Sequence, residues 1–110
     1  MDEQVVGQDL VLQTERDGAR GIITIKGELD AYTAPAVEEQ ITKLTDAQVT
    51  TVVLDLSETT FLDSSGLRAI LTAHRRLEGA GGLVLRAPSE PVVRLLEITG
   101  LTDHFRVEAR

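Results

Sequence analysis

The sequence predicts a single α/β domain built around a mixed, mostly parallel β-sheet with an antiparallel hairpin at its N-terminal end. Two observations predict this fold. Runs of aliphatic and β-branched residues alternate with stretches of helical periodicity, and no repeat, low-complexity tract or long linker divides the 110 residues. The expected order is β-β-α-β-α-β-α-β, and strands joined by helices are expected to lie parallel with right-handed crossovers. We expect one domain over residues 1–110, in which residues 1–8 form a loosely ordered N-terminal segment.

The first half of the chain predicts a hairpin followed by a helix. Residues 10–12 and 22–25 are apolar runs typical of strands, and Asp17-Gly18 between them is a turn signal, so the two strands are expected to pair. A helix is expected from Pro35 to Leu44, because apolar residues recur there at helical spacing: Val37, Ile41 and Leu44. Thr33 is its expected N-cap, and proline suits a first helical turn.

The second half repeats the alternation of strand and helix twice. Residues 51–56 read as a buried strand, and a helix ending near Gly79 is expected after it from an apolar stripe of Leu67, Ile70, Leu71, His74 and Leu77. Residues 83–85 form another short apolar run. Ser89 then marks a helix start, and the stripe before Gly100 consists of Val92, Leu95 and Leu96. Residues 105–107 are expected to form an edge strand.

The composition excludes several classes of function. Aromatic residues make up only 3% of the chain and the formal net charge is −7, so neither nucleic acid nor an anionic membrane is an expected partner. Cysteine is absent, which excludes disulfides and thiolate metal sites. No apolar stretch reaches the roughly 18–20 residues of a membrane span, and the polar, acidic N-terminus is unlike a signal peptide. We therefore expect a cytoplasmic protein.

The segment from Phe61 to Leu67 is the strongest candidate for a functional site, because it joins the central strand to a helix start. One interpretation is that Asp63 or Ser64 is only an N-cap. Three polar residues in a row exceed what a cap needs. Gly66 in the first turn costs about 1 kcal/mol relative to alanine, which favours a position that another backbone or a phosphate approaches closely. A helix N-terminus also stabilises negative charge, so a phosphorylated serine is physically sensible there.

The segment Asp63-Ser64-Ser65-Gly66-Leu67, placed after the strand at 52–56, resembles the phosphorylation loop of bacterial anti-sigma factor antagonists, the STAS-domain family. Two further segments resemble the same family: residues 27–30 (Gly-Glu-Leu-Asp) and residues 95–101 (Leu-Leu-Glu-Ile-Thr-Gly-Leu). The three appear in the family's order and at about its spacing, and they cover nearly the whole chain. The resemblance implies a single STAS-like domain.

The resemblance also implies a partner-switching role in transcription regulation. In this family the unphosphorylated protein binds an anti-sigma factor, which is also a serine kinase of the GHKL ATPase type, and thereby releases a sigma factor. The kinase phosphorylates the first serine of the loop, and a PP2C-type phosphatase removes the mark. Carried over by position, the acceptor is Ser64 and not Ser65. With two histidines and no cysteine, no metal site is expected, no cofactor is expected either, and the chain is not expected to be an enzyme.

The residues expected to contact the partner are Asp30, Asp63, Ser64, Ser65, Gly66 and Arg68. Asp30, on a neighbouring loop, either helps to orient the hydroxyl and contact the kinase or only marks the entry to a helix. Arg68, Arg75 and Arg76 place positive charge on the helix after the serine. They form either a solvated helix face or a contact surface for the kinase.

Two alternatives compete with this hypothesis. A serine hydrolase needs a base, but His74 lies ten residues along the helix from Ser64, about 15 Å away, and His104 precedes the expected edge strand. A carboxylate site of Asp30, Asp55 and Asp63 is disfavoured, because Asp55 alternates within a strand. The glycine-rich segment at 79–82 follows a helix and precedes a strand, the reverse of the order around a nucleotide-binding loop, so ATP is expected to come with the partner.

The other alternative is a STAS scaffold or sensor subunit of a stress-signalling complex.

Overall fold

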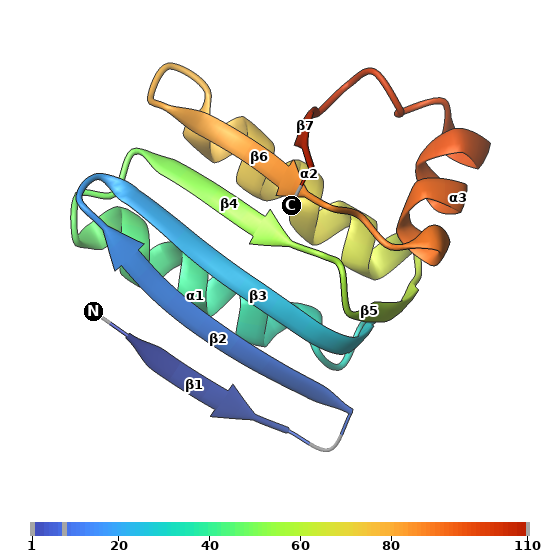
Figure 1. Ribbon diagram of the computed structural model, residues 1–110, viewed down its shortest axis with the longest axis horizontal. Helices are drawn as coiled ribbons and strands as arrows, with labels where there is room; N and C mark the ends of the chain where they lie inside the picture. The colour runs from blue at the N-terminus through green and yellow to red at the C-terminus, as the bar shows by residue number, and fades with distance from the viewer. Residues whose placement is uncertain (1, 8, 110) are drawn as a thin grey trace.

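Strands and helices alternate along the chain in the computed structural model, which describes residues 2–7 and 9–109 (Figure 1). The described part of the chain contains seven strands and three helices in an α/β arrangement. In chain order these are β1 (Glu3–Val6), β2 (Leu10–Asp17), β3 (Arg20–Leu29), α1 (Ala34–Asp46), β4 (Thr51–Asp55), β5 (Thr59–Leu62), α2 (Ser64–Leu77), β6 (Gly82–Arg86), α3 (Glu90–Thr99) and β7 (Arg106–Glu108).

The strands form one mixed sheet in the order β1-β2-β3-β4-β6-β7, and β5 pairs with β3 beyond the end of β4. The expected hairpin is confirmed: β2 and β3 are antiparallel, with Leu12 opposite Ile25 and Asp17 opposite Arg20. The pairs β3–β4, β3–β5, β4–β6 and β6–β7 are parallel, as strands separated by helices should be. The predicted mixed, mostly parallel sheet with three main helices is therefore confirmed.

Two strands differ from the expectation. The N-terminal segment is not loosely ordered over its described residues, because β1 pairs antiparallel with β2 and Val5 packs against the core. Lys43 of α1 also reaches Glu3, with Nζ 3.0 Å from Oε1. The other unexpected strand is β5, which is held to β3 by the Thr59 hydroxyl donating to the Ile25 carbonyl over 2.9 Å. Both strands are short, and pairing with a longer neighbour rather than their own apolar pattern makes them strands.

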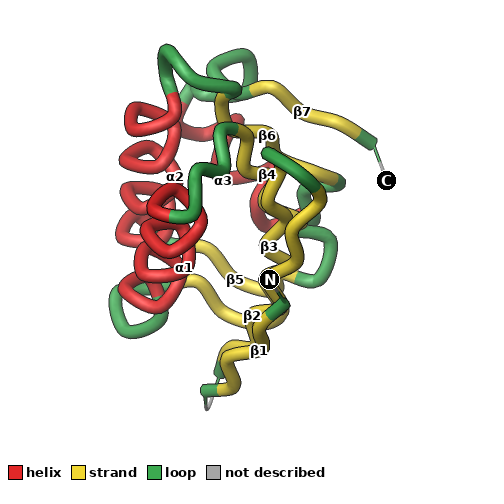
Figure 2. Tube along the Cα trace, turned by 90° about the vertical axis from the view of Figure 1, so that its left-hand side faces the viewer, coloured by secondary structure: helices red, strands yellow, loops and turns green. Residues whose placement is uncertain are grey.

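Helices α1 and α2 lie side by side on one face of the sheet, whereas α3 packs against β5 (Figure 2). The core between helices and sheet is aliphatic, as the low aromatic content predicts. Its fully buried members include Leu12, Ile23, Ile25, Leu29, Ile41, Leu44, Leu54, Ile70, Leu77 and Leu85. This packing fixes the two loops that follow β3 and β5 at the same end of the sheet, because Leu29 and Leu62 are register partners.

Candidate functional site

The loop with the two serines begins directly after β5, so a short strand separates it from the central strand to which we expected it to be joined. Asp63 is the N-cap of α2 and has extended backbone angles, φ −110° and ψ −173°. Its Oδ1 accepts hydrogen bonds from the Ser65 amide (2.9 Å) and the Gly66 amide (3.0 Å). A carboxylate therefore satisfies two of the amides that a helix start leaves unpaired.

Ser64 is the first residue of α2, and its side chain is exposed. Among residues 2–7 and 9–109, no hydrogen-bond partner contacts its hydroxyl. Ser65 is only half-buried, but its amide is already engaged by Asp63. The N-cap of α2 is therefore Asp63 and not Ser64. The Ser64 hydroxyl makes no hydrogen bond that stabilises the described part of the chain.

Gly66 is a position that another backbone approaches closely, as its place in the first helical turn predicted. It is buried, and a Cβ added there would lie 2.5 Å from the carbonyl oxygen of Leu29 and 2.6 Å from Cδ1 of Leu62. The backbone that approaches this glycine is therefore the end of β3 in the same chain, not a partner. The glycine lets α2 start in direct contact with the sheet. Its expected contact with a partner stays a prediction, which this packing does not support.

Asp30 stands on the loop between β3 and α1, next to the serine loop. The two loops meet at Leu29, whose carbonyl accepts a hydrogen bond from the Asp63 amide over 3.3 Å. Asp30 Oδ1 accepts from the amides of Tyr32 (2.9 Å) and Thr33 (3.1 Å). Of the two roles left open for Asp30, the structure therefore shows the entry to a helix.

Thr33 occupies the expected N-cap position of α1 but makes no side-chain bond to a helix amide. Its hydroxyl donates instead to the Glu28 carbonyl over 2.8 Å. The residue was placed correctly by the sequence, whereas the capping bond was not. The first amides after the turn are bonded by Asp30.

Two exposed aromatic residues beside these loops were not predicted from the sequence. Tyr32 is 92% exposed in the turn before α1, and Phe61 in β5 is 44% exposed. The chain has only three aromatic residues, and the third, Phe105, is buried. Their positions within three residues of Asp30 and Ser64 were visible in the sequence and could have singled them out. Exposed aromatic residues are typical of surfaces that bind another protein.

The arginines of α2 differ in their contacts. Arg68 and Arg75 are exposed, and no carboxylate pairs with either of them in the described part of the chain. Arg76 is held across the helix pair, donating to the Thr42 and Thr45 hydroxyls over 2.9 Å each. The last of these three side chains therefore links α2 to α1, whereas the first two are directed to solvent.

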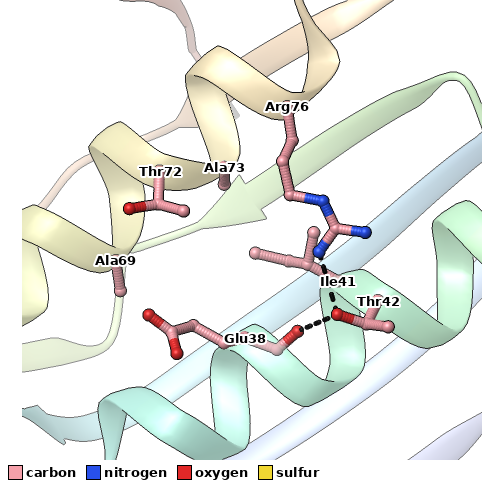
Figure 3. A pocket seen from close by; sticks show the side chains of 7 residues that line it. All are labelled: Glu38, Ile41, Thr42, Ala69, Thr72, Ala73 and Arg76. Atoms are coloured by element: carbon pink, nitrogen blue, oxygen red, sulfur yellow. Dashed lines mark hydrogen bonds between the residues drawn. The ribbon is translucent and has the colours of Figure 1, made fainter.

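A groove runs between α1 and α2 with a volume of about 200 Å³ (Figure 3). Ala69, Ala73 and Ile41 line it, and the Glu38 carboxylate and the Arg76 guanidinium lie toward opposite ends. The two alanines are buried and lie on the side of α2 that faces α1. The groove is smaller than a typical ligand pocket of about 300–1,000 Å³, and two of its polar side chains, Arg76 and Thr42, already join the helices.

The residues of the enzyme alternatives lie in structural surroundings. His74 is at the margin of the core, as expected, with its ring 5.3 Å from Phe105 and 4.8 Å from His104 between centroids. Asp55 is buried and accepts from the amide and the hydroxyl of Ser57. Over the described residues, no group of three or more metal-ligating side chains comes together. In the same part of the chain, no helix has the length and apolar character to span a bilayer.

Comparison with protein families identifies the class. The model of the STAS domain matches residues 11–110, which is nearly the whole chain. The chain belongs to the STAS-domain family. Among curated relatives it is similar to the anti-sigma-B factor antagonist of Listeria monocytogenes, with 37% identity over 86% of this chain and 83% of the relative. The anti-sigma-B factor antagonist of Bacillus subtilis is 33% identical over 80% of this chain and 81% of its own.

Solved structures place the chain beside the same group of proteins. An anti-sigma factor antagonist from Mycobacterium paratuberculosis superposes with a TM-score of 0.80 and 27% identity, covering 90% of this chain and 85% of its own. The antagonist SpoIIAA in its unphosphorylated form gives a TM-score of 0.75 at 27% identity, over 87% of this chain and 86% of the other. SpoIIAA of Bacillus in its phosphorylated form gives 0.72 at 26% identity, over 90% and 91%.

Proposed function

We propose that this chain is an anti-sigma factor antagonist that is switched by phosphorylation of Ser64. In the unmodified state it binds an anti-sigma factor in the cytoplasm and so releases a sigma factor. The anti-sigma factor is a serine kinase of the GHKL type, and a PP2C-type phosphatase restores the unmodified state. The relatives named as antagonists support the general function, and the structure of a phosphorylated neighbour supports the kind of switch.

One observation carries the choice of residue. Ser64 is exposed at the first position of α2, and its hydroxyl is not bonded within the described chain because Asp63 has taken the cap. A kinase can therefore reach this oxygen without breaking a bond of the fold. Ser65 is half-buried and lies further into the helix, so it is the weaker acceptor.

The contact surface that we propose surrounds this hydroxyl. It comprises Asp30, Tyr32, Phe61, Asp63, Ser64, Ser65 and Arg68, and it omits Gly66 because that residue is buried against β3. Tyr32 and Phe61 supply apolar area, and the charged residues around them supply specificity. Asp30 and Asp63 contribute through the carboxylate oxygen that is not engaged in the turn or the cap.

Phosphorylation would dismantle such an interface by charge. The phosphate adds about −1.5 to −2 charges next to Asp63, on a chain with a net charge of −7. Burying a dianion against a partner costs several kcal/mol unless cations compensate both of its charges. Because each 1.4 kcal/mol changes affinity tenfold, the complex is expected to weaken by orders of magnitude. The fold itself should survive, because the modified oxygen is exposed.

The test is to incubate the purified protein with candidate GHKL-type anti-sigma kinases and ATP and to map the product by peptide mass spectrometry. We expect one phosphate on Ser64. Ser64→Ala should form the complex and accept no phosphate, and Ser65→Ala is the matched control that should be modified at the normal rate. Phosphate on Ser65, or normal modification of Ser64→Ala, would contradict the assignment. The absence of any complex with such kinases would contradict the function.

A further inference from the structure

Arg68 lies one helical turn after Ser64 on the same exposed face of α2. Both side chains are exposed, and residues four apart on a helix have Cβ atoms about 5–6 Å apart. Helical side chains lean toward the N-terminus, so the arginine at 68 leans toward the serine at 64. A guanidinium in that position can reach a group attached to the serine oxygen.

Arg68 has no ion-pair partner in the region described, and the same is true there of Arg16, Arg75, Arg76 and Arg106. The remaining cations of that region are paired with carboxylates. These pairs are Arg20 and Arg86 with Glu108, Arg94 with Glu90, Lys26 with Glu58, and Lys43 with Glu3. The guanidinium of Arg68 is therefore available to a new anion, and no existing ion pair has to break.

The usual ligands for a phosphate at a helix start are already occupied here. The amides of Ser65 and Gly66 both donate to Asp63 Oδ1, and the Leu67 amide donates to the Asp63 carbonyl over 2.9 Å. A phosphate on Ser64 would have to displace this cap in order to use these amides. It would also lie beside the Asp63 carboxylate, with Asp30 on the adjoining loop. The cation one turn away is a donor that needs no such displacement.

We propose that Arg68 is the internal counter-ion of the phosphate on Ser64, an inference that deepens the proposed function and rests on it. In the unmodified protein Arg68 binds an acidic group of the anti-sigma factor. After phosphorylation the guanidinium binds two phosphate oxygens of its own chain, because arginine and phosphate form paired charge-assisted hydrogen bonds. Phosphorylation thus adds negative charge to the surface and also removes a cation from it.

The experiment measures the ionisation of the phosphate itself. Phosphoserine is incorporated at position 64 by codon suppression, and its ³¹P chemical shift is followed through pH 4–8. A neighbouring guanidinium stabilises the dianion, so Arg68→Gln should raise the second pKa of the phosphate by about 0.2–0.4. Arg68→Lys, which keeps the charge, should retain most of the effect of the arginine.

Arg75→Gln is the matched control. It removes the same charge from an exposed, unpaired arginine of α2, but Arg75 lies eleven residues from Ser64, about 16 Å along the helix. Its phosphate should titrate like that of the parent protein. Equal pKa values for the parent and Arg68→Gln would overturn the inference, as would an equal change in Arg75→Gln. Because the phosphoserine is installed without a kinase, this result is independent of whether the proposed anti-sigma kinase is found.

Discussion

Helices α2 and α3 each have a serine at the N-terminal end, Ser64 as the first residue of α2 and Ser89 as the N-cap of α3, and the two hydroxyls differ in their contacts. At α3, Ser89 is in the N-cap position and half-buried, and its hydroxyl donates to the Thr59 carbonyl over 2.5 Å. At α2, the cap is the carboxylate of Asp63, and the exposed hydroxyl of Ser64 has no partner in the described chain. The difference teaches that a serine at a helix start is available for modification only when another group has taken over its structural bonds.

A kinase assay is the strongest test of the difference between these two serines. With the anti-sigma kinase and ATP, Ser64→Ala should abolish phosphate incorporation and leave the complex undissociated. Phosphorylated parent protein should bind at least a hundredfold more weakly, since several kcal/mol are lost. Calorimetry of the two forms against the kinase measures this difference.

Ser89→Ala is the control for that experiment, because it removes the bonded hydroxyl and leaves the free one. It should be phosphorylated at the rate of the parent protein. A large drop in its rate, with the fold intact by circular dichroism, would show that the distinction between a bonded and an unbonded serine does not decide which one reacts.

The third residue of each helix extends the contrast to packing. Gly66 in α2 and Val92 in α3 are both buried, but only the glycine has a neighbouring backbone where its Cβ would lie. Gly66→Ala should therefore destabilise the domain by about 1–3 kcal/mol, the usual range for overpacking. Urea unfolding measures it, with Ser65→Ala as the adjacent control. A neutral Gly66→Ala would mean that α2 can shift away from Leu29 without loss.

Removing the N-cap of α2 tests which side chain at each helix start contributes to the stability of the domain. Asp63→Ala leaves two amides without their acceptor and should lower the free energy of unfolding by about 1 kcal/mol. Ser89→Ala should cost a similar amount through the lost bond to Thr59. Ser64→Ala should cost almost nothing. Urea unfolding of the three variants would contradict the comparison if Ser64→Ala were the most damaging.

The smallest expected effect concerns the ion pair between Arg86 at the end of β6 and Glu108 of β7. Arg86 donates to Glu108 Oε1 over 2.8 Å, and this bond, followed by the positive charges of Arg20 and Arg86, lowers the pKa of the Glu108 carboxyl. A lowered pKa contributes stability above the unfolded-state value, and that stability is lost as the pH falls through the folded value. The Tm difference between the parent and Glu108→Gln should therefore be small at pH 7 and shrink on acidification. A difference that grows in acid would contradict this sign.

The sequence predicted the parts of the fold that depend on long, regular patterns. The hairpin of β2 and β3 and the three helices follow from apolar spacing that their own residues carry. Strands β1 and β5 were not predicted, because each has only four residues and is extended through its pairing with a longer strand, β2 and β3 respectively. The segment Thr59–Leu62 has no alternation strong enough to predict a strand, and its pairing with Gly27–Leu29 is visible only in three dimensions.

The candidate site was located from the sequence. The sequence did not show which residue of the site caps the helix and which one is left exposed. The string Asp63-Ser64-Ser65-Gly66 identified a helix start with spare polar groups. It did not tell which residue caps the helix, because Asp63 and Ser64 are both good caps. Nor did it show that the backbone next to Gly66 belongs to Leu29, a contact between residues 37 positions apart in the chain.

The Leu29 carbonyl has a consequence for how fast and how selectively this surface can associate. It accepts the Asp63 amide and abuts Gly66, so the loops after β3 and β5 are fastened to one peptide group at the end of the sheet. A surface that is already rigid loses little conformational entropy when it docks, and a partner need not wait for it to rearrange. Its complexes should therefore form by a single encounter step, with selectivity set by the match of shape and charge at first contact.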